Sequence, residues 1–182
     1  MSKLIFILGG ARSGKSSYAQ ELAHETGKSV TFIATAQALD DEMSARIKKH
    51  QQERPANWGT REISLDISEH LRADPIQTDI VLLDCITLLL NNLFMPYVEN
   101  DIVDEKRSMQ AVQREVDDLL DCIREGKQDW IVISNEVGLG VVPAYQMGRA
   151  YRDILGWANQ KLAKEADNVI FMIAGIPMVV KG

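Results

Sequence analysis

The segment from Gly9 to Ser16 constrains this chain more than any other. Its sequence, Gly-Gly-Ala-Arg-Ser-Gly-Lys-Ser, fits the phosphate-binding pattern G-x-x-x-x-G-K-[ST] at every position. An apolar run of strand type at 3–8 precedes it, and good helix formers at 17–23 follow it. Strand, glycine loop and helix in this order are the context in which the pattern binds phosphate, and a glycine-rich turn without a ligand is the alternative. The segment predicts a site for a nucleoside triphosphate.

Each residue type in this loop has a chemical reason to be there. Glycines let the backbone curl so that successive N–H groups point at a phosphate, and the start of the helix adds the positive end of its dipole. Lys15 supplies a charge that orients the triphosphate for catalysis, and the Ser16 hydroxyl is a ligand for Mg²⁺. The predicted nucleotide-binding residues are therefore Gly9, Gly10, Ala11, Arg12, Ser13, Gly14, Lys15 and Ser16.

Length and composition are those of an ordinary globular protein. The 182 residues are 46% hydrophobic and 25% charged, which predicts a single domain over residues 1–182. The net charge of −6 provides no overall field that attracts nucleic acid, so local positive groups have to bind a polyphosphate. The apolar runs are of strand length, no signal-peptide pattern occurs, and Cys85 and Cys122 lack metal-ligand spacing. We expect a cytoplasmic protein with reduced thiols, no membrane span and no nucleic-acid partner.

Apolar runs alternate with amphipathic segments along the chain, and this alternation predicts an α/β fold of the phosphate-loop NTPase type. A mostly parallel sheet with helices on both faces is expected, and Gly175 is expected to turn the last strand into an antiparallel edge strand. Right-handed crossovers would place the loop at 9–16 and the ends of strands 80–84 and 130–134 along one rim. The expected strands are 3–8, 29–35, 60–64, 80–84, 130–134 and 168–174. Helices are expected to start near residues 17 and 40, to span 65–73 and about 109–125, and to start again at Pro143. Met147 is expected on the core face of this last helix. Residues 86–106 are expected to form a helical turn and then an irregular loop.

Asp84 ends one of these apolar runs and is the candidate partner of Ser16 in a metal site. A continuous apolar run is typical of a strand buried on both faces of a parallel sheet. In phosphate-loop proteins, a carboxylate at the end of such a strand commonly reaches the magnesium or its waters. An aspartate that caps the following helix is the alternative. The predicted magnesium ligands are Ser16 and Asp84.

A histidine in a basic segment is the second signal. Residues 44–54 hold four cations against one carboxylate, a local reversal of sign in an acidic chain. Arg46, His50 and Arg54 are spaced four apart and so share one stripe of a helix, at the border of its apolar face. Periodicity alone leaves two interpretations open: a half-buried structural histidine, or a histidine held beside phosphates as a nucleophile or acid–base group.

Six segments together resemble one known family. They are Gly-Gly-Ala-Arg-Ser-Gly-Lys-Ser at 9–16, Phe-Ile-Ala-Thr-Ala at 32–36, Leu-Asp-Asp-Glu-Met at 39–43, Ala-Arg-Ile-Lys-Lys-His at 45–50, Arg-Pro-Ala-Asn-Trp at 54–58 and Asn-Glu-Val-Gly-Leu-Gly-Val-Val-Pro at 135–143. In this order they resemble the bifunctional adenosylcobinamide kinase / adenosylcobinamide-phosphate guanylyltransferase family of cobalamin biosynthesis. The resemblance covers nearly the whole chain, and the segments after the phosphate loop are its more specific part.

The resemblance implies a two-step enzyme. It would phosphorylate the aminopropanol hydroxyl of adenosylcobinamide with GTP or ATP, and then transfer GMP from GTP to that phosphate through a guanylylated histidine, His50 here. Family members are trimers whose substrate is a corrinoid. Matching positions imply further nucleotide contacts at Ile33, Ala34, Thr35, Gln51, Gln52, Glu53, Arg54, Glu62 and Asp84.

Two positions depart from the family pattern. Asp84 stands where enterobacterial members have glutamate, which is one methylene longer, and Lys49 stands where they have a second histidine. The lysine removes a rival acceptor beside His50. A plain small-molecule kinase remains an alternative, in which His50 is structural. A regulatory GTP-binding switch is disfavoured, because the sequence has no Asn-Lys-x-Asp guanine signature and Asp84 is not followed by x-x-Gly.

Overall fold

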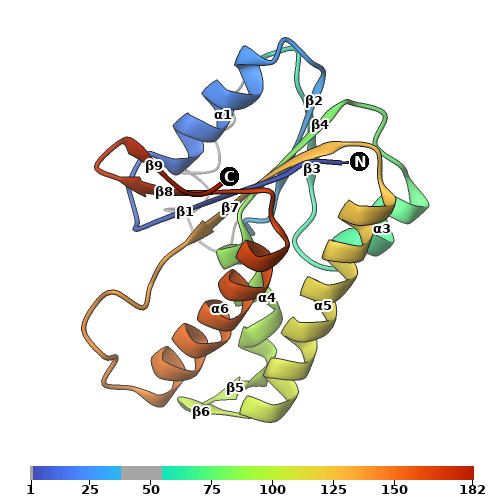
Figure 1. The fold of residues 1–182 in the computed structure, drawn as a ribbon. Coiled ribbons are helices and arrows are strands. Elements are labelled where there is room, and N and C mark those ends of the chain that lie inside the picture. Colours follow the sequence, from blue (N-terminus) through green and yellow to red (C-terminus); the bar gives the residue numbers. More distant parts are fainter. Residues whose placement is uncertain (1, 38–54) are drawn as a thin grey trace.

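A seven-stranded sheet forms the centre of the molecule (Figure 1). The computed structural model describes residues 2–37 and 55–182, and the helix expected from about residue 40 to 52 lies outside them. Strand order is β3–β2–β4–β7–β1–β8–β9, and only the pairing of β8 with β9 is antiparallel. The strands are β1 (Leu4–Gly9), β2 (Val30–Ala34), β3 (Gly59–Glu62), β4 (Ile80–Asp84), β7 (Asp129–Asn135), β8 (Asn168–Ile173) and β9 (Ile176–Lys181). The predicted mostly parallel sheet with an antiparallel edge strand is confirmed.

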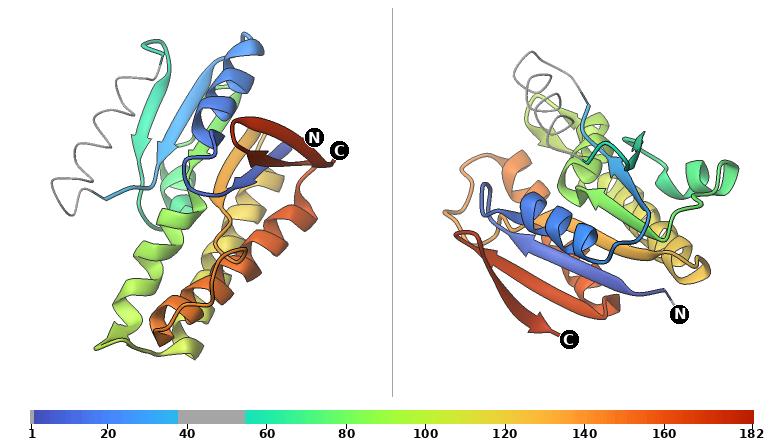
Figure 2. Two further views of the ribbon diagram at one scale, coloured as in Figure 1. Left: turned by 90° about the vertical axis from the view of Figure 1, so that its left-hand side faces the viewer. Right: turned by 90° about the horizontal axis from the view of Figure 1, so that it is seen from above.

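Helices cover both faces of this sheet, which explains its continuous apolar strands (Figures 1 and 2). Along β7, Trp130 and Val132 pack with the cluster that includes α5 and α6, whereas Ile131 and Ile133 pack with the cluster that includes α1. Because successive side chains of a strand point to opposite faces, both sets are buried. One face carries α1 (Lys15–Glu25); the other carries α3 (Ile67–Ala73), α4 (Ile86–Phe94), α5 (Glu105–Glu125) and α6 (Gln146–Glu165).

The long amphipathic helix expected before Gly126 is confirmed as α5. Asp104 caps its start, because the carboxylate accepts a hydrogen bond from the backbone N–H of Arg107 at 3.0 Å. Val112, Val116 and Leu119 are fully buried along its inner face. None of the helices in the described ranges is long and apolar enough to cross a membrane.

The prediction for residues 86–106 was wrong. They form the nine-residue helix α4, a 3₁₀ turn at Met95–Tyr97 and a two-stranded hairpin of β5 (Val98–Glu99) and β6 (Ile102–Val103). The hairpin turns through Asn100 and Asp101, both with positive φ. Leu89, Leu90 and Phe94 are at most 1% exposed, so packing against the neighbouring helices stabilises a helix whose short apolar run gave no clear period.

The start of the last helix also differs from the prediction. Helix α6 begins at Gln146 and not at Pro143, and the side chain of Met147 is exposed and not part of the core. Arg149 explains the later start, because its Nη1 donates to the backbone carbonyls of Pro143 (3.0 Å) and Ala144 (2.6 Å). These carbonyls are thereby held by a side chain rather than by the helix backbone.

Candidate nucleotide and metal site

The phosphate loop connects β1 to α1 at the rim where the parallel strands end (Figure 1). Two of its glycines cannot be replaced without a clash or strain. A Cβ on Gly9 would lie 2.6 Å from the backbone oxygen of Met172. Gly14 has φ +93°, and its Cβ would lie 3.2 Å from the Cα of Gly175. Gly9 is therefore required by the close approach of the neighbouring strand β8, and Gly14 by the left-handed backbone of the loop.

Lys15 is buried in the mouth of this loop. Its ammonium group donates to the backbone oxygen of Gly10 at 2.7 Å, and the residue is 7% exposed. Burial lowers the pKa of Lys15 below its ordinary value, and the nearby Cys85 and Asp84 act against that shift. The cation is therefore held inside the loop, close to where the pattern expects phosphate.

Ser16 and Asp84, the two predicted metal ligands, are in contact. The Ser16 hydroxyl, in the first turn of α1, donates to the Asp84 carboxylate at the end of β4 at 2.7 Å. A hydroxyl and a carboxylate are the oxygen ligands that Mg²⁺ prefers, so this pair fits the ion. Within residues 2–37 and 55–182 no group of three or more His, Cys, Asp or Glu could hold a metal.

The three positions that the resemblance implies at the end of β2 and directly after it lie within the core. Ile33 and Thr35 are fully buried, and Ala34 is 7% exposed. The Thr35 hydroxyl donates to the backbone oxygen of Cys85 at 2.7 Å and accepts from its N–H at 2.8 Å. Thr35 therefore fixes the backbone directly after Asp84, which is a supporting role for the carboxylate.

Cys85 itself does not have the character of a nucleophile. It is buried, and this burial raises the pKa of its thiol to about 12. Only the thiolate is reactive, so the residue stays a neutral packing group at physiological pH.

The remaining residues predicted to contact the nucleotide are Glu62 and those at 50–54. Glu62 is exposed at the end of β3, in register with Ala34 of β2, and so lies along the same rim. His50, Gln51, Gln52, Glu53 and Arg54 lie outside the described residues.

Two later segments of the chain also hold the phosphate loop. The sequence predicts that the end of strand 130–134 lies on the same rim, but it does not predict these backbone contacts. The backbone N–H of Gly175, in the turn between β8 and β9, donates to the oxygen of Ser13 at 2.9 Å. The N–H of Glu136, just after β7, donates to the oxygen of Gly9 at 3.0 Å. The glycine at the last turn was visible in the sequence, but its contact with a loop some 160 residues earlier had no local signal.

The fold has a counterpart among solved structures. The crystal structure of the RadB recombinase matches with a TM-score of 0.50 at 16% sequence identity, covering 93% of this chain and 73% of that one. At this identity the likeness concerns the fold alone.

Sequence relatives cover nearly the whole chain. The bifunctional adenosylcobalamin biosynthesis protein CobP of Pseudomonas aeruginosa is 44% identical over 97% of this chain and 96% of its own length. The corresponding CobU proteins of Escherichia coli and Salmonella typhimurium are 38% and 40% identical, each over 98% of this chain and 99% of their own lengths. A sequence model of cobinamide kinase / cobinamide phosphate guanyltransferase matches residues 5–180. With the phosphate loop and its Ser16–Asp84 pair at the rim, these matches show that the chain belongs to the cobinamide kinase / cobinamide phosphate guanyltransferase family.

Proposed function

We propose that this protein carries both activities that its family is named for. It phosphorylates the hydroxyl of adenosylcobinamide with a nucleoside triphosphate, and it transfers GMP from GTP to the resulting phosphate. The observation that carries the proposal is the Ser16–Asp84 contact of 2.7 Å beside the phosphate loop, in a chain matched to the family over residues 5–180.

The loop from Gly9 to Ser16 binds the triphosphate in this proposal. Its N–H groups and the start of α1 surround the phosphates, and Lys15 exchanges the carbonyl of Gly10 for phosphate oxygens. Ser16 and Asp84 would hold Mg²⁺, which neutralises phosphate charge when it is bound. Glu62 can accept hydrogen bonds from the N1–H and amino group of guanine.

His50 is the proposed nucleophile of the transferase step. A neutral imidazole nitrogen attacks the α-phosphorus of GTP, an N–P bond forms, and the bond to the leaving pyrophosphate breaks. The phosphate of the acceptor then takes the GMP, which frees the imidazole. Support comes from the sequence: Arg46, Lys49 and Arg54 lie within four positions of His50 along the chain, and cations of this kind would stabilise the negative charge that develops.

We also propose that the chain acts in the cytoplasm as a homotrimer. The edge strand β9 supports assembly, because it exposes Ile176, Met178, Val179 and Val180, each at least 49% accessible. An apolar edge strand of this kind is usually covered. Sedimentation should give a species of about three times the chain mass of 20.4 kDa.

Incubation with labelled GTP tests the function. We expect α-labelled GTP to leave a covalent, acid-labile label on the wild type and none on His50→Ala, with release of pyrophosphate. His24→Ala is the matched control, since His24 is exposed on α1 and should label normally. Wild-type protein without an α-label would refute the transferase step. Phosphorylation of cobinamide from γ-labelled nucleotide, surviving in His50→Ala, would then leave a plain kinase.

A further inference from the structure

A groove between the first turns of α5 and α6 stands apart from the phosphate loop. Its volume is about 890 Å³, near the upper end of the range of roughly 300–1,000 Å³ for small-molecule sites. The N-terminal ends of both helices extend beyond the edge where the strands end (Figure 2). Ligands of α/β proteins bind outside that edge. The groove therefore lies at the same end of the strands as the phosphate loop, and its volume is larger than a nucleotide needs.

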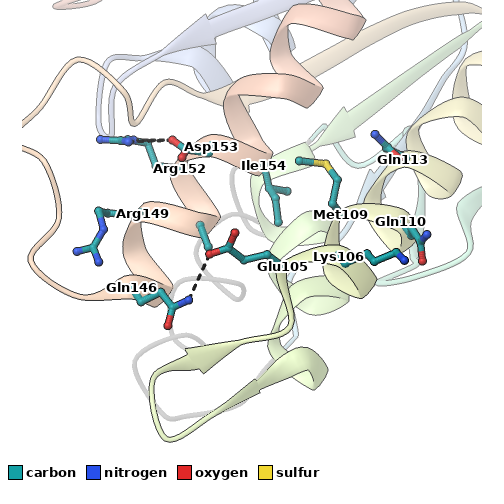
Figure 3. A pocket seen from close by; sticks show the side chains of 11 residues that line it. Glu105, Lys106, Met109, Gln110, Gln113, Gln146, Arg149, Arg152, Asp153 and Ile154 are labelled. Atoms are coloured by element: carbon teal, nitrogen blue, oxygen red, sulfur yellow. Dashed lines mark hydrogen bonds and ion pairs between the residues drawn. The ribbon is translucent and has the colours of Figure 1, made fainter.

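The groove combines apolar and polar side chains, and the apolar ones lie at its centre. Met109 of α5 and Ile154 of α6 lie at its centre, between the polar side chains of the two helices (Figure 3). Gln110 and Gln113 on α5 form no hydrogen bond with another described residue, and Gln146 on α6 donates to Glu105 at 3.2 Å. Charged side chains line the rest of the groove, where Glu105 is bound by Gln146 and Arg152 pairs with Asp153. An apolar centre with unpaired carboxamides beside it suits a large ring that has apolar edges and amide arms.

One loop connects this groove to the phosphate loop. It begins at Glu136, whose N–H donates to the oxygen of Gly9, and it ends at α6. Val141 and Leu139 in this loop are 95% and 80% exposed, although both are apolar. Arg149 lines the groove and holds the end of the loop through Nη1 alone, so Nη2 has no partner among the described residues. The loop therefore leads from the phosphate loop, past exposed apolar side chains, to Arg149 at the groove.

We propose that this groove and the loop at 136–145 form the acceptor site, which binds the carboxamide-bearing corrin ring. The inference rests on the proposed function, because it takes its ligand from that reaction. The corrin ring covers Met109, next to the buried Ile154. Its carboxamide arms pair with Gln110 and Gln113, and its hydroxyl or phosphate arm passes Arg149 toward the phosphate loop. Amide-to-amide pairing is suited to this recognition, because each group both donates and accepts.

The test separates acceptor binding from the chemistry of the nucleotide. Gln110→Leu combined with Gln113→Leu removes the carboxamides, and Met109→Trp fills the centre. Gln160→Leu, exposed on α6 away from the groove, is the matched control. Cobinamide binding is followed by the visible absorbance of the corrin, without nucleotide. We expect both groove variants to bind about tenfold more weakly or worse, from the loss of two hydrogen bonds or of space, and the control to bind as the wild type does.

A second measurement tests the same variants with α-labelled GTP. The covalent label should form normally in the groove variants, since that step needs no acceptor, and its transfer to cobinamide phosphate should be slowed. Unchanged cobinamide binding in both groove variants would overturn the acceptor site. So would a shift in sedimentation without a change in corrinoid binding, which would assign the groove to contact with a second copy. Loss of the label in the wild type, with groove-dependent cobinamide binding intact, would refute the transferase step and leave the acceptor site standing.

Discussion

Asp84 is the residue on which the chemistry of the nucleotide site depends most directly. It ends β4, receives the hydroxyl hydrogen bond of Ser16, and is fixed by the two hydrogen bonds between Thr35 and Cys85 directly after it. A short carboxylate whose backbone is held on both sides loses little entropy on binding a metal. The position therefore combines a charge with a fixed direction.

At this scale we predict that Asp84→Asn raises the Mg²⁺ concentration needed for half-maximal turnover by about tenfold or more. The amide keeps the shape of the side chain and can still accept from Ser16, but it lacks the charge that attracts the ion. Turnover measured over a Mg²⁺ titration checks this. Asp121→Asn is the control, because Asp121 is exposed on α5 and pairs with Arg124 at the surface. An equal Mg²⁺ requirement in wild type and Asp84→Asn would exclude Asp84 as a ligand.

Single residues of the site differ in how far the sequence could predict them. Lys15, Ser16 and Asp84 follow from a motif and from the end of an apolar run, and the structure brings the last two into contact. Thr35 was expected to line the nucleotide, whereas its hydroxyl is buried on Cys85. That hydrogen bond joins β2 to the end of β4, and no local pattern reports which strands are neighbours.

Among the elements, the β8–β9 hairpin has a role beyond closing the sheet. Its turn consists of Ala174 and Gly175, with φ of 50° and 84°, so both residues have the left-handed backbone of a tight two-residue turn. The backbone N–H of Gly175 donates to the backbone oxygen of Ser13. The backbone of Gly14 passes so close to Gly175 that a Cβ added at Gly14 would touch it. The hairpin thus supports the phosphate loop from outside.

We predict that Gly175→Ala lowers the free energy of unfolding by about 1–2 kcal/mol and also weakens nucleotide binding by a few-fold. A side chain strains the positive φ, and relief of that strain moves the N–H away from Ser13. Gly27→Ala is the matched control: Gly27 has φ +65° and open space around it, but lies past the end of α1. Urea unfolding should show a similar loss in both variants. Nucleotide titration should separate them, and equal affinities would argue against support by the hairpin.

The elements also show where sequence reasoning failed. The sequence predicts helix α5 because apolar residues recur at spacings of three and four from Met109 to Ile123, although the helix begins earlier, at Glu105. For residues 86–106 the three leucines at 88–90, Pro96 and the acidic residues predict only a helical turn, whereas α4 has nine residues. Helix α4 exists because Leu89, Leu90 and Phe94 are buried between the sheet and other helices. That burial is a tertiary effect.

For the whole molecule, one buried charge couples stability to pH. Glu115 on α5 is 7% exposed and accepts a hydrogen bond from the backbone N–H of Ile67, at the start of α3, at 3.0 Å. Burial raises the pKa of this carboxyl above its ordinary value of 4.5, although that hydrogen bond acts the other way. At pH values between 4.5 and the raised pKa, the folded protein binds more protons at this carboxyl than the unfolded chain does.

The contribution of Glu115 to stability therefore falls as pH rises through that window and is constant above it. We predict that Glu115→Gln removes this slope, because the amide still accepts from Ile67 and carries no charge to bury. Glu115→Ala should lose about 1–3 kcal/mol, because the N–H of Ile67 is left unpaired in the core. Urea unfolding at a series of pH values from 4 to 8 measures both. A Glu115→Gln protein with the same pH slope as the wild type would contradict the assignment.

The sequence by itself determined the phosphate loop, the strands of the main sheet, its mostly parallel character and the family. These follow from short-range patterns: a contiguous motif, apolar runs buried on both faces, and a helix repeat long enough to be periodic. Only the tertiary structure decided which distant side chains meet, because strand order inserts β1 between β7 and β8 and brings Gly175 and Glu136 to the loop at Gly9. It also decided that α4 is a full helix, and that α5 and α6 leave a groove beside a loop that begins at the phosphate site. Packing between elements far apart in the chain has no local signal, which is the physical reason for that division.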